Sequence, residues 1–164
     1  MAQEIARDFG DQPLTVLGVL TGSLMVVADL VRQLPMPLKI AFVQAASYSG
    51  ATTTAGELHL GTMLREQIAG RDVLVVDDIF DTGRTLRAIV EQLQLLGASS
   101  IRTAVLLRKK DRQQVTLPLD YVGFEIPNVF VVGFGLDYDD AYRQLPYVAA
   151  LEVPDSGPGK SALP

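Results

Sequence analysis

The residues best suited to chemistry form one short stretch in the middle of the chain. Two adjacent carboxylates, Asp77 and Asp78, come directly after a run of apolar residues, Val73 to Val76. Two anions side by side repel each other unless they face hydroxyls or share a cation, so sugar hydroxyls and Mg²⁺ are their natural partners. A phosphorylated sugar would supply both kinds of group. A second polar cluster begins after Ile79 and Phe80 and consists of Asp81, Thr82, Gly83, Arg84 and Thr85.

The surrounding sequence predicts a strand, a polar loop and a helix that position these groups. Val73 to Val76 are consecutive apolar residues, mostly β-branched, as is typical of a strand buried on both faces of a parallel sheet. The first N–H groups of a helix are unpaired and lie at the positive end of its dipole, so a phosphate would bind there beside Thr82 and Thr85. The apolar residues at helical spacing that predict the helix are Leu86, Ile89, Val90, Leu93 and Leu96, closed by Gly97.

The stretch VVDDIFDTGRTL, residues 75–86, resembles the phosphoribosyl pyrophosphate motif of phosphoribosyltransferases. An isolated DTG would be weak evidence, but an acidic pair after a buried strand, followed by DTGRT at the start of a helix, is a specific pattern. The alternative interpretation of this stretch is a solvated turn. Similarity to the hypoxanthine-guanine branch of the family runs from about the first helix to Leu151.

This resemblance implies an α/β fold of the type I phosphoribosyltransferase class, with a parallel core sheet, helices on both faces and a small C-terminal hood. It implies a purine salvage enzyme that transfers phosphoribosyl from phosphoribosyl pyrophosphate to hypoxanthine or guanine, giving IMP or GMP and pyrophosphate, with Mg²⁺ as cofactor. We expect a cytoplasmic homodimer or homotetramer whose partners are these small molecules, rather than nucleic acid or a membrane.

The resemblance also implies roles for the motif residues. Asp81 would be the acid/base that handles the proton on a purine ring nitrogen, a group that N-glycosidic chemistry requires. Asp77 and Asp78 would hold the ribose hydroxyls and Mg²⁺. The sugar phosphate would be bound by Asp81, Thr82, Gly83, Arg84 and Thr85.

Residues for the base and the pyrophosphate come later in the chain by the same resemblance. Lys109 would donate to the exocyclic oxygen of hypoxanthine or guanine, which adenine lacks, and Phe130 would stack on the ring. The backbone at Val131 and Asp137 would contact the opposite edge, Asp137 would reach a second Mg²⁺ through water, and Arg143 would meet the pyrophosphate. Judged without the resemblance, Phe130 is an ordinary core residue and Lys109 belongs to a solvated charge run.

A second strand, loop and helix precede the motif. Leu14 to Leu20 predict a strand, and Ser23 could cap a helix that ends before Pro35. Spacing alone indicates an ordinary connection between a strand and a helix. The resemblance implies a loop whose backbone amides bind pyrophosphate; most relatives carry Lys or Arg where Thr21 stands, so we expect only the backbone contribution. The loop residues are Leu20, Thr21, Gly22 and Ser23.

Residues 47–57 are small and polar, with no apolar period. Their composition predicts a surface hairpin, whereas the resemblance makes Ser47 and Tyr48 the start of a substrate-binding loop that closes over the site. His59, the only histidine, is more typical of a solvent-facing strand residue than of a metal ligand. Pro154 to Pro164 predict a disordered tail, which leaves residues 1–153 as a single domain.

Composition limits the function classes. A chain of 164 residues, 48% of them hydrophobic, fits one α/β domain with a proper core. It has no cysteine for disulfide or thiol chemistry, and no apolar run approaches the ~20 residues of a membrane span. The net charge of -5, without a basic block, argues against a general affinity for nucleic acid. In the family a further strand usually precedes the first helix, so the resemblance implies a short amino terminus.

Two other protein classes share part of the motif. The letters VLVVDD also open receiver domains of response regulators, but there a phosphoacceptor Asp ends a later strand, and none ends the strand predicted over Ile101 to Leu107. The other class is the pyrimidine attenuator type, regulatory proteins of the same fold that bind RNA or DNA. Such regulators tend to carry a non-acidic residue at the position of Asp81, together with a basic face. This class remains the alternative interpretation.

Overall fold

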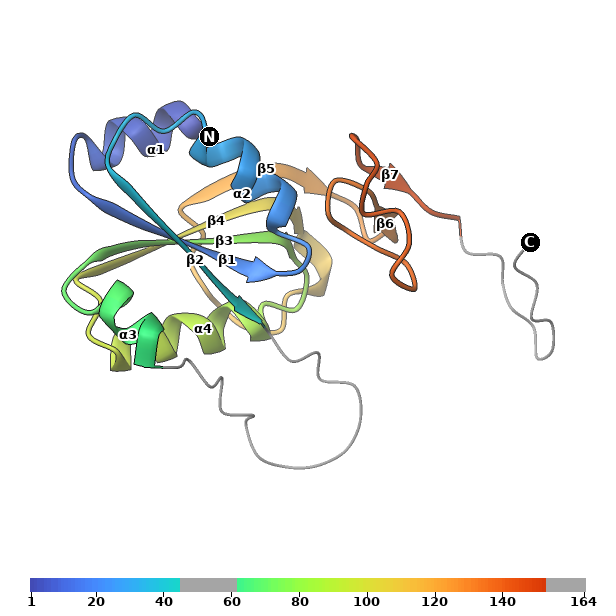
Figure 1. Cartoon of the computed structure of the whole chain (residues 1–164). Helices are drawn as coiled ribbons and strands as arrows, with labels where there is room; N and C mark the ends of the chain where they lie inside the picture. The colour runs from blue at the N-terminus through green and yellow to red at the C-terminus, as the bar shows by residue number, and fades with distance from the viewer. Residues whose placement is uncertain (45–61, 153–164) are drawn as a thin grey trace.

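The computed structural model describes residues 1–44 and 62–152. Its centre is a five-stranded parallel sheet with the order β2-β1-β3-β4-β5 (Figure 1). The strands are β1 (Leu14–Leu20), β2 (Leu38–Gln44), β3 (Asp72–Phe80), β4 (Ser100–Lys109) and β5 (Tyr121–Ile126). The helices are α1 (Ala2–Phe9), α2 (Leu24–Val31), α3 (Thr62–Ile68), α4 (Arg84–Leu95) and the 3-10 helix η1 (Lys110–Arg112).

Helices cover both faces of the sheet, as predicted. Helices α1 and α2 pack on one face, and α3 and α4 on the other (Figure 1). Residues of the central strand alternate between the two cores: Leu74 and Val76 join the core under α1 and α2, and Val73 and Val75 join the core over α4. All four are fully buried, and burial of each such side chain contributes about 1.5–3 kcal/mol.

Strand β3 is longer than the sequence predicts. We expected a loop directly after Asp78, yet the strand runs on to Phe80 because Ile79 and Phe80 still pair with β4, at Leu107 and Arg108. The acidic pair therefore lies inside a strand. The rigid ladder, rather than a loop, fixes the directions of these two carboxylates.

The predicted side-chain cap of α2 is wrong. Ser23 is the residue before the first helical position, but its backbone is itself helical and its hydroxyl makes no capping hydrogen bond. The side chain is fully buried instead. Gly97, which we expected to close α4, does follow that helix and has a φ of 81°, the left-handed conformation that favours glycine at a helix end.

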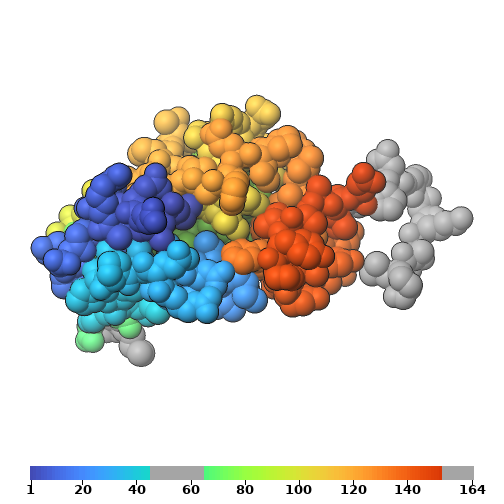
Figure 2. All heavy atoms as spheres, turned by 90° about the horizontal axis from the view of Figure 1, so that it is seen from above, coloured from blue at the N-terminus to red at the C-terminus, as the bar shows by residue number. Residues whose placement is uncertain are grey.

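Beyond β5 the chain forms a small unit, residues 127–152, which we call the hood. It contains a two-stranded antiparallel sheet of β6 (Val131–Val132) and β7 (Ala149–Ala150). Figures 1 and 2 show the hood at one end of the molecule, beyond the carboxyl ends of the core strands. It touches the core closely, because a Cβ atom on Gly135 would overlap the backbone carbonyl of Gly22. The predicted C-terminal hood is present.

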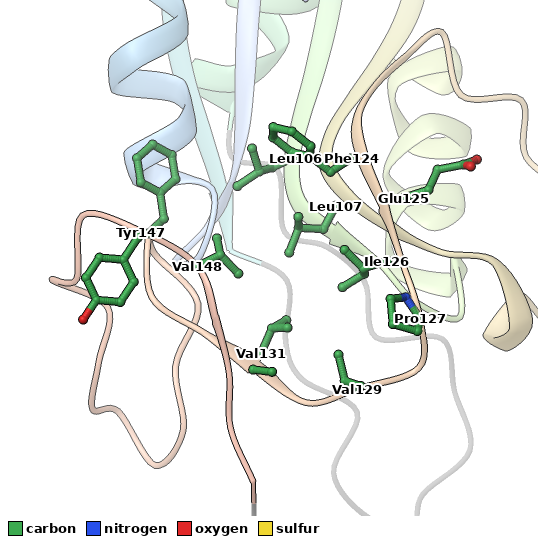
Figure 3. A pocket seen from close by; sticks show the side chains of 12 residues that line it. Leu106, Leu107, Phe124, Glu125, Ile126, Pro127, Val129, Val131, Tyr147 and Val148 are labelled. Carbon is green, nitrogen blue, oxygen red and sulfur yellow. The ribbon is translucent and has the colours of Figure 1, made fainter.

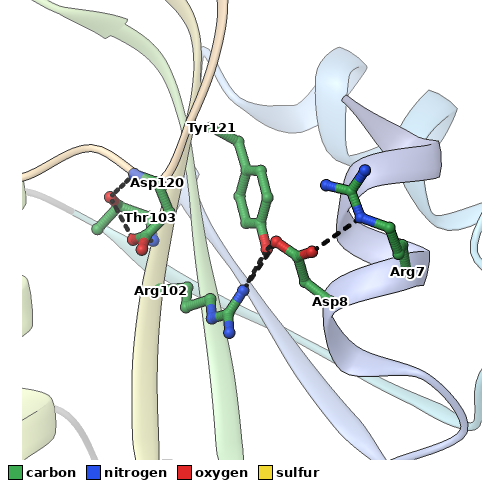
Figure 4. A network of polar contacts seen from close by, with 6 residues as sticks. All are labelled: Arg7, Asp8, Arg102, Thr103, Asp120 and Tyr121. Carbon is green, nitrogen blue, oxygen red and sulfur yellow. Dashed lines mark hydrogen bonds and ion pairs between the residues drawn. The ribbon is translucent and has the colours of Figure 1, made fainter.

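A polar network fixes α1 against the sheet at the opposite end (Figure 4). The Tyr121 hydroxyl donates to Oδ2 of Asp8 at 3.0 Å, and Nη1 of Arg102 lies 3.0 Å from the same oxygen. Arg102 also donates to the Tyr121 hydroxyl at 2.7 Å. The Asp8 carboxylate thus attaches α1 to both β4 and β5.

Several predictions concern residues outside the described ranges. They are those for Ser47, Tyr48, the rest of residues 47–57, His59 and the tail from Pro154. Among the described helices, none is long and apolar enough to cross a membrane.

Candidate active site

The order of the strands determines where a site can form. Strands β1 and β3 are neighbours, but the chain leaves β1 toward β2 and leaves β3 toward β4, so the connections diverge in opposite directions. A crevice opens at the carboxyl ends of two such strands, where ligands of parallel α/β folds bind. The loop after β1 and the loop after β3 meet there beneath the hood. Between them lies a cavity of about 340 Å³.

This cavity brings together most of the predicted site residues from three separate parts of the chain. The loop after β1, the end of β3 with the start of α4, and the hood each contribute to its wall. The predicted residues that line it are Leu20, Thr21, Gly22, Asp77, Asp78, Asp81, Thr82, Gly83, Thr85, Asp137 and Arg143. The sequence did not single out four apolar residues that also line it, because they look like ordinary core residues; these are Val19, Ile79, Phe80 and Leu86.

The acidic pair is costly to bury. Burial raises the pKa of the Asp77 carboxyl well above its usual range, and the negative charge of Asp78 adds to this. Burial also raises the pKa of Asp78, while the nearby Arg143 charge acts in the opposite direction. Oδ1 of Asp77 accepts from the Asp78 N–H at 3.0 Å, and Oδ1 of Asp78 accepts from the Ile79 N–H at 2.8 Å. These bonds fix two carboxylates that repel each other, an arrangement that a cation would relieve.

The loop after β3 leaves room for an anion at the start of α4. Gly83 has a φ of 80° and is buried, and a Cβ atom there would lie 2.6 Å from both the Phe80 ring and the Val115 side chain. Only glycine fits this position. Gly83, the residue before α4, has no side chain that could cap the helix, and the Arg84 N–H makes a long hydrogen bond of 3.5 Å to the Thr82 hydroxyl. The first turn of α4 lies at the cavity wall beside Thr82 and Thr85, where a helix start commonly binds anions.

The hood contributes one ion pair to the cavity. Nη2 of Arg143 lies 2.9 Å from Oδ1 of Asp137, and Nη1 donates to the Gly135 carbonyl at 2.8 Å. The other oxygen of Asp137 accepts from the backbone N–H of Asp140 at 3.0 Å. Contacts within the hood thus hold Arg143 over the acidic pair, and of the described residues that line this cavity it is the only cation.

Some predicted residues lie outside the cavity wall. Ser23 is buried behind the loop after β1, and its N–H is used within the chain, donating to the Val19 carbonyl at 3.3 Å. Arg84 points to solvent from the first turn of α4. Phe130 is half-exposed in the hood, and its ring meets that of Tyr138 edge-to-face at 5.6 Å between centroids.

Lys109 is close to Asp81 by strand register, although it does not line the cavity. Phe80 on β3 pairs with Arg108 on β4, so Asp81, the first residue after β3, and Lys109, the last residue of β4, lie at the same level of adjacent strands. The Lys109 side chain is only 7% exposed. A lysine buried to this degree is uncommon unless a partner is available for its ammonium group.

Val131 lines a second cavity of about 570 Å³ (Figure 3). This one lies between the ends of β4 and β5 and the hood, and its wall is mostly apolar. Leu106, Phe124 and Tyr147 contribute large side chains to it. Val131 is the first residue of β6 and does not line the first cavity.

One contact at the site was not predicted. Nε of Arg112 lies 2.9 Å from Oδ1 of Asp81. We interpreted the run from Arg108 to Arg112 as a solvated strand end in the absence of the resemblance, and a pattern of charges cannot tell which of them turns back toward another loop. No local sequence signal would have identified this pair.

The acidic residues fit a hydrated cation better than a closed metal cage. Among the described residues, no three acidic or histidine side chains are grouped so that they could hold a metal by themselves. Mg²⁺ usually takes one or two protein carboxylates and completes its shell with water and substrate phosphates. Asp77 is buried and the adjacent Asp78 is half-buried at the cavity wall, and both have a raised pKa, so the pair matches that requirement.

The comparisons with known proteins agree with this geometry. A family profile described as phosphoribosyl transferase domain matches residues 1–139. The chain belongs to the phosphoribosyltransferase family. A hypoxanthine-guanine phosphoribosyltransferase of Staphylococcus epidermidis is 41% identical over 153 residues, covering 93% of this chain and 86% of the relative. A protein of the same name from Dictyostelium discoideum is 39% identical over 156 residues, covering 93% and 87%.

Solved structures of the family superpose well. A crystal structure of a hypoxanthine-guanine phosphoribosyltransferase from Bacillus anthracis has a TM-score of 0.81 and 34% identity, covering 92% of this chain and 89% of that one. A hypoxanthine phosphoribosyltransferase from Trypanosoma cruzi, in a ternary substrates complex, has a TM-score of 0.82 and 38% identity, covering 92% and 86%. Membership of this family excludes the receiver-domain interpretation.

Proposed function

We propose that this chain is a purine salvage enzyme of the hypoxanthine-guanine type. It transfers phosphoribosyl from phosphoribosyl pyrophosphate to hypoxanthine or guanine and releases IMP or GMP with pyrophosphate. The observation that carries the proposal is that one cavity contains an acidic pair, the start of helix α4 and a further carboxylate, Asp81. Relatives named for this activity are about 40% identical over nearly the whole chain.

In the proposed reaction a bond forms between a ring nitrogen of the base and C1 of the ribose, as the bond from C1 to the pyrophosphate oxygen breaks. Pyrophosphate leaves with the electron pair of that bond. The proton carried by the purine ring moves to the Asp81 carboxylate, which acts as the general base. Asp81 is suited to this role because its side chain lines the same cavity as the acidic pair, three residues after Asp78.

The phosphate and pyrophosphate groups would occupy opposite walls. The sugar phosphate would accept hydrogen bonds from the first N–H groups of α4 and from the hydroxyls of Thr82 and Thr85, as helix starts commonly provide. The pyrophosphate would lie between the loop after β1 and Arg143. Since Thr21 supplies no cationic side chain, Arg143 and backbone N–H groups would carry that contact.

The base would be selected by its oxygen. Lys109 would donate to the exocyclic oxygen of hypoxanthine or guanine, and Phe130 would move onto the ring from its present contact with Tyr138. The backbone at Val131 would contact the opposite edge of the base. An adenine offers an amino group where the oxygen stands, so its donor would oppose the donor of Lys109.

Mg²⁺ would be held by Asp77 and Asp78, with Asp137 reached through water, and would neutralise the charge of the donor's phosphates. We also propose a cytoplasmic homodimer or homotetramer, extending the expectations from the resemblance. The regulatory alternative gains no support, because Asp81 is acidic and the net charge of the chain is -5.

The test is direct. Purified protein is incubated with Mg²⁺, phosphoribosyl pyrophosphate and, separately, hypoxanthine, guanine, xanthine or adenine, and nucleotide formation is followed by chromatography. We expect nucleotide from hypoxanthine or guanine, little from adenine, and none when EDTA removes the metal. Absence of nucleotide from every purine, with RNA binding detected instead, would favour the regulatory alternative.

A further inference from the structure

The segment that follows β4 rests directly on the loop that carries Asp81. The N–H of Gln114 donates to the Thr82 carbonyl at 3.0 Å. The Val115 side chain lies against Gly83, where it and the Phe80 ring leave no space for a Cβ atom. These contacts hold the segment in register with the loop, so a side chain between Lys109 and Gln114 has a defined position relative to Asp81.

Arg112 is the side chain that turns toward Asp81. Its Nε lies 2.9 Å from Oδ1, and no other ion pair of this carboxylate is found in the described part of the chain. Oδ1 is buried, and no described residue donates a hydrogen bond of good geometry to it, so the ion pair with Arg112 is the polar contact that it makes. Asp81 lines the cavity, whereas Arg112 does not. Any effect of Arg112 on a bound purine therefore acts through Asp81.

The neighbouring cations turn the other way. Nη1 of Arg108 lies 3.7 Å from Oε1 of Glu125 on β5, and Lys110 also forms an ion pair with Glu125. Arg112 thus pairs with a carboxylate at the cavity, whereas Lys110 and Arg108, near the end of β4, pair with Glu125 on the outer strand. Because Lys110 and Arg112 belong to the same short helix, Lys110 provides a matched control for the effects of removing a charge from it.

We propose that Arg112 is a positioning residue, which holds Oδ1 of Asp81 and so presents Oδ2 to the purine. This inference rests on the proposed function, since it requires Asp81 to receive the proton. In that step the N–H proton of the ring moves to Oδ2, its electron pair stays on the ring, and the new bond to the ribose forms. A carboxylate that rotated freely would spend less time with Oδ2 directed at the N–H proton of the purine. Misplacements of this size at a reacting group lower the turnover rate.

The experiment compares Arg112→Gln, Arg112→Lys, Lys110→Gln, Asp81→Asn and the double variant Arg112→Gln/Asp81→Asn. Steady-state kcat and KM are measured with hypoxanthine and phosphoribosyl pyrophosphate, and melting temperature is measured for each. We expect Arg112→Gln to lower kcat roughly 10–100-fold with both KM values nearly unchanged. Arg112→Lys, which can still pair with a carboxylate, should recover part of the loss, and Lys110→Gln should behave as the wild type.

The double variant separates a positioning role from a merely structural one. If Arg112 acts through Asp81, the double variant should be no slower than Asp81→Asn alone, because groups that act as a unit are not additive. A double variant slowed by the product of both single effects, a normal kcat for Arg112→Gln, or an equal loss in Lys110→Gln would each overturn the proposal. Full activity of Asp81→Asn would instead overturn the role of Asp81 itself, and the inference about Arg112 with it.

Discussion

Gly22 packs directly against the carboxylate of Asp78. A Cβ atom on residue 22 would overlap the Asp78 side chain, and on the other side the Gly22 carbonyl leaves no space for a side chain at Gly135. One glycine therefore lets the loop after β1, the acidic pair and the hood meet. This close approach brings the proposed pyrophosphate and metal contacts within one cavity.

Gly22→Ala should disturb donor binding more than folding. The added methyl group has to displace the Asp78 carboxylate, so we expect kcat/KM for phosphoribosyl pyrophosphate to fall roughly 10–100-fold. Gly10→Ala is the control, because a Cβ atom there meets open space and the residue lies far from the cavity. It should cost some stability, since Gly10 has a φ of 57°, but leave the kinetics alone. Equal kinetics for both variants would remove Gly22 from the site.

Asp77→Asn should stabilise the protein while impairing it as an enzyme. The substitution removes a buried charge beside another carboxylate, and the amide can still accept the Asp78 N–H. We expect the free energy of unfolding to rise by roughly 1–2 kcal/mol, or about 2–8 °C in melting temperature. Calorimetry in EDTA measures this without a metal contribution. The exposed Asp11→Asn variant carries the same change in charge and should melt like the wild type; a lower melting point for Asp77→Asn would contradict the burial argument.

Lys109→Gln should weaken the preference for oxo purines. The amide can donate or accept, so it would no longer oppose the amino group of adenine, and the loss of a charged donor should lower kcat/KM for hypoxanthine roughly 10–100-fold. The ratio of kcat/KM values for hypoxanthine and adenine measures the change. The control is Lys110→Gln, whose side chain pairs with Glu125. An unchanged ratio in Lys109→Gln would mean that this buried lysine has only a structural role.

Asp8 should stabilise the fold only at pH values where its carboxyl group is ionised. The hydrogen bond from Tyr121 lowers the pKa of Asp8 below its ordinary value of 3.8, with the charges of Arg7 and Arg102 acting in the same direction. A carboxylate with a lowered pKa in the folded state contributes stability above its unfolded pKa and loses it as the pH falls toward the folded pKa.

Urea titrations of wild type and Asp8→Asn at several pH values test this. The variant should be less stable at pH 7, and the difference should stay constant down to about pH 5 and shrink below 3.8. Asp11→Asn should show no such pH-dependent difference. If the difference in the free energy of unfolding between wild type and Asp8→Asn stayed constant into the acid range, the ionised form of Asp8 would not be the source of the stabilisation.

Local sequence patterns predicted the core of the fold, because a buried strand and a helix each leave a recognisable arrangement of apolar residues in the sequence. Four buried residues in a row marked β3, and apolar residues at helical spacing marked α4. The end of β3 was placed too early, since Asp77 and Asp78 look like the end of a strand when their pairing with β4 is unknown. Pairing between strands, not local propensity, extends that strand to Phe80.

The site was predicted where it is contiguous in sequence and missed where it depends on packing. Asp81 and its loop follow one another, so spacing and resemblance were sufficient to propose them. Arg112 reaches Asp81 from another strand connection, and Ser23 is buried although the residues before it, Leu20 to Gly22, line the cavity. Both are consequences of tertiary contacts that no local pattern contains.

The most direct measurement is the turnover of Asp81→Asn. Wild type and variant are compared with Mg²⁺, phosphoribosyl pyrophosphate and hypoxanthine, following IMP by absorbance and donor affinity by calorimetry. Asparagine keeps the size of the side chain and one acceptor oxygen but cannot take the proton, so we predict a kcat roughly 10²–10⁴-fold lower with donor affinity nearly unchanged. A variant that forms IMP at the wild-type rate would contradict the assignment of Asp81 as the general base.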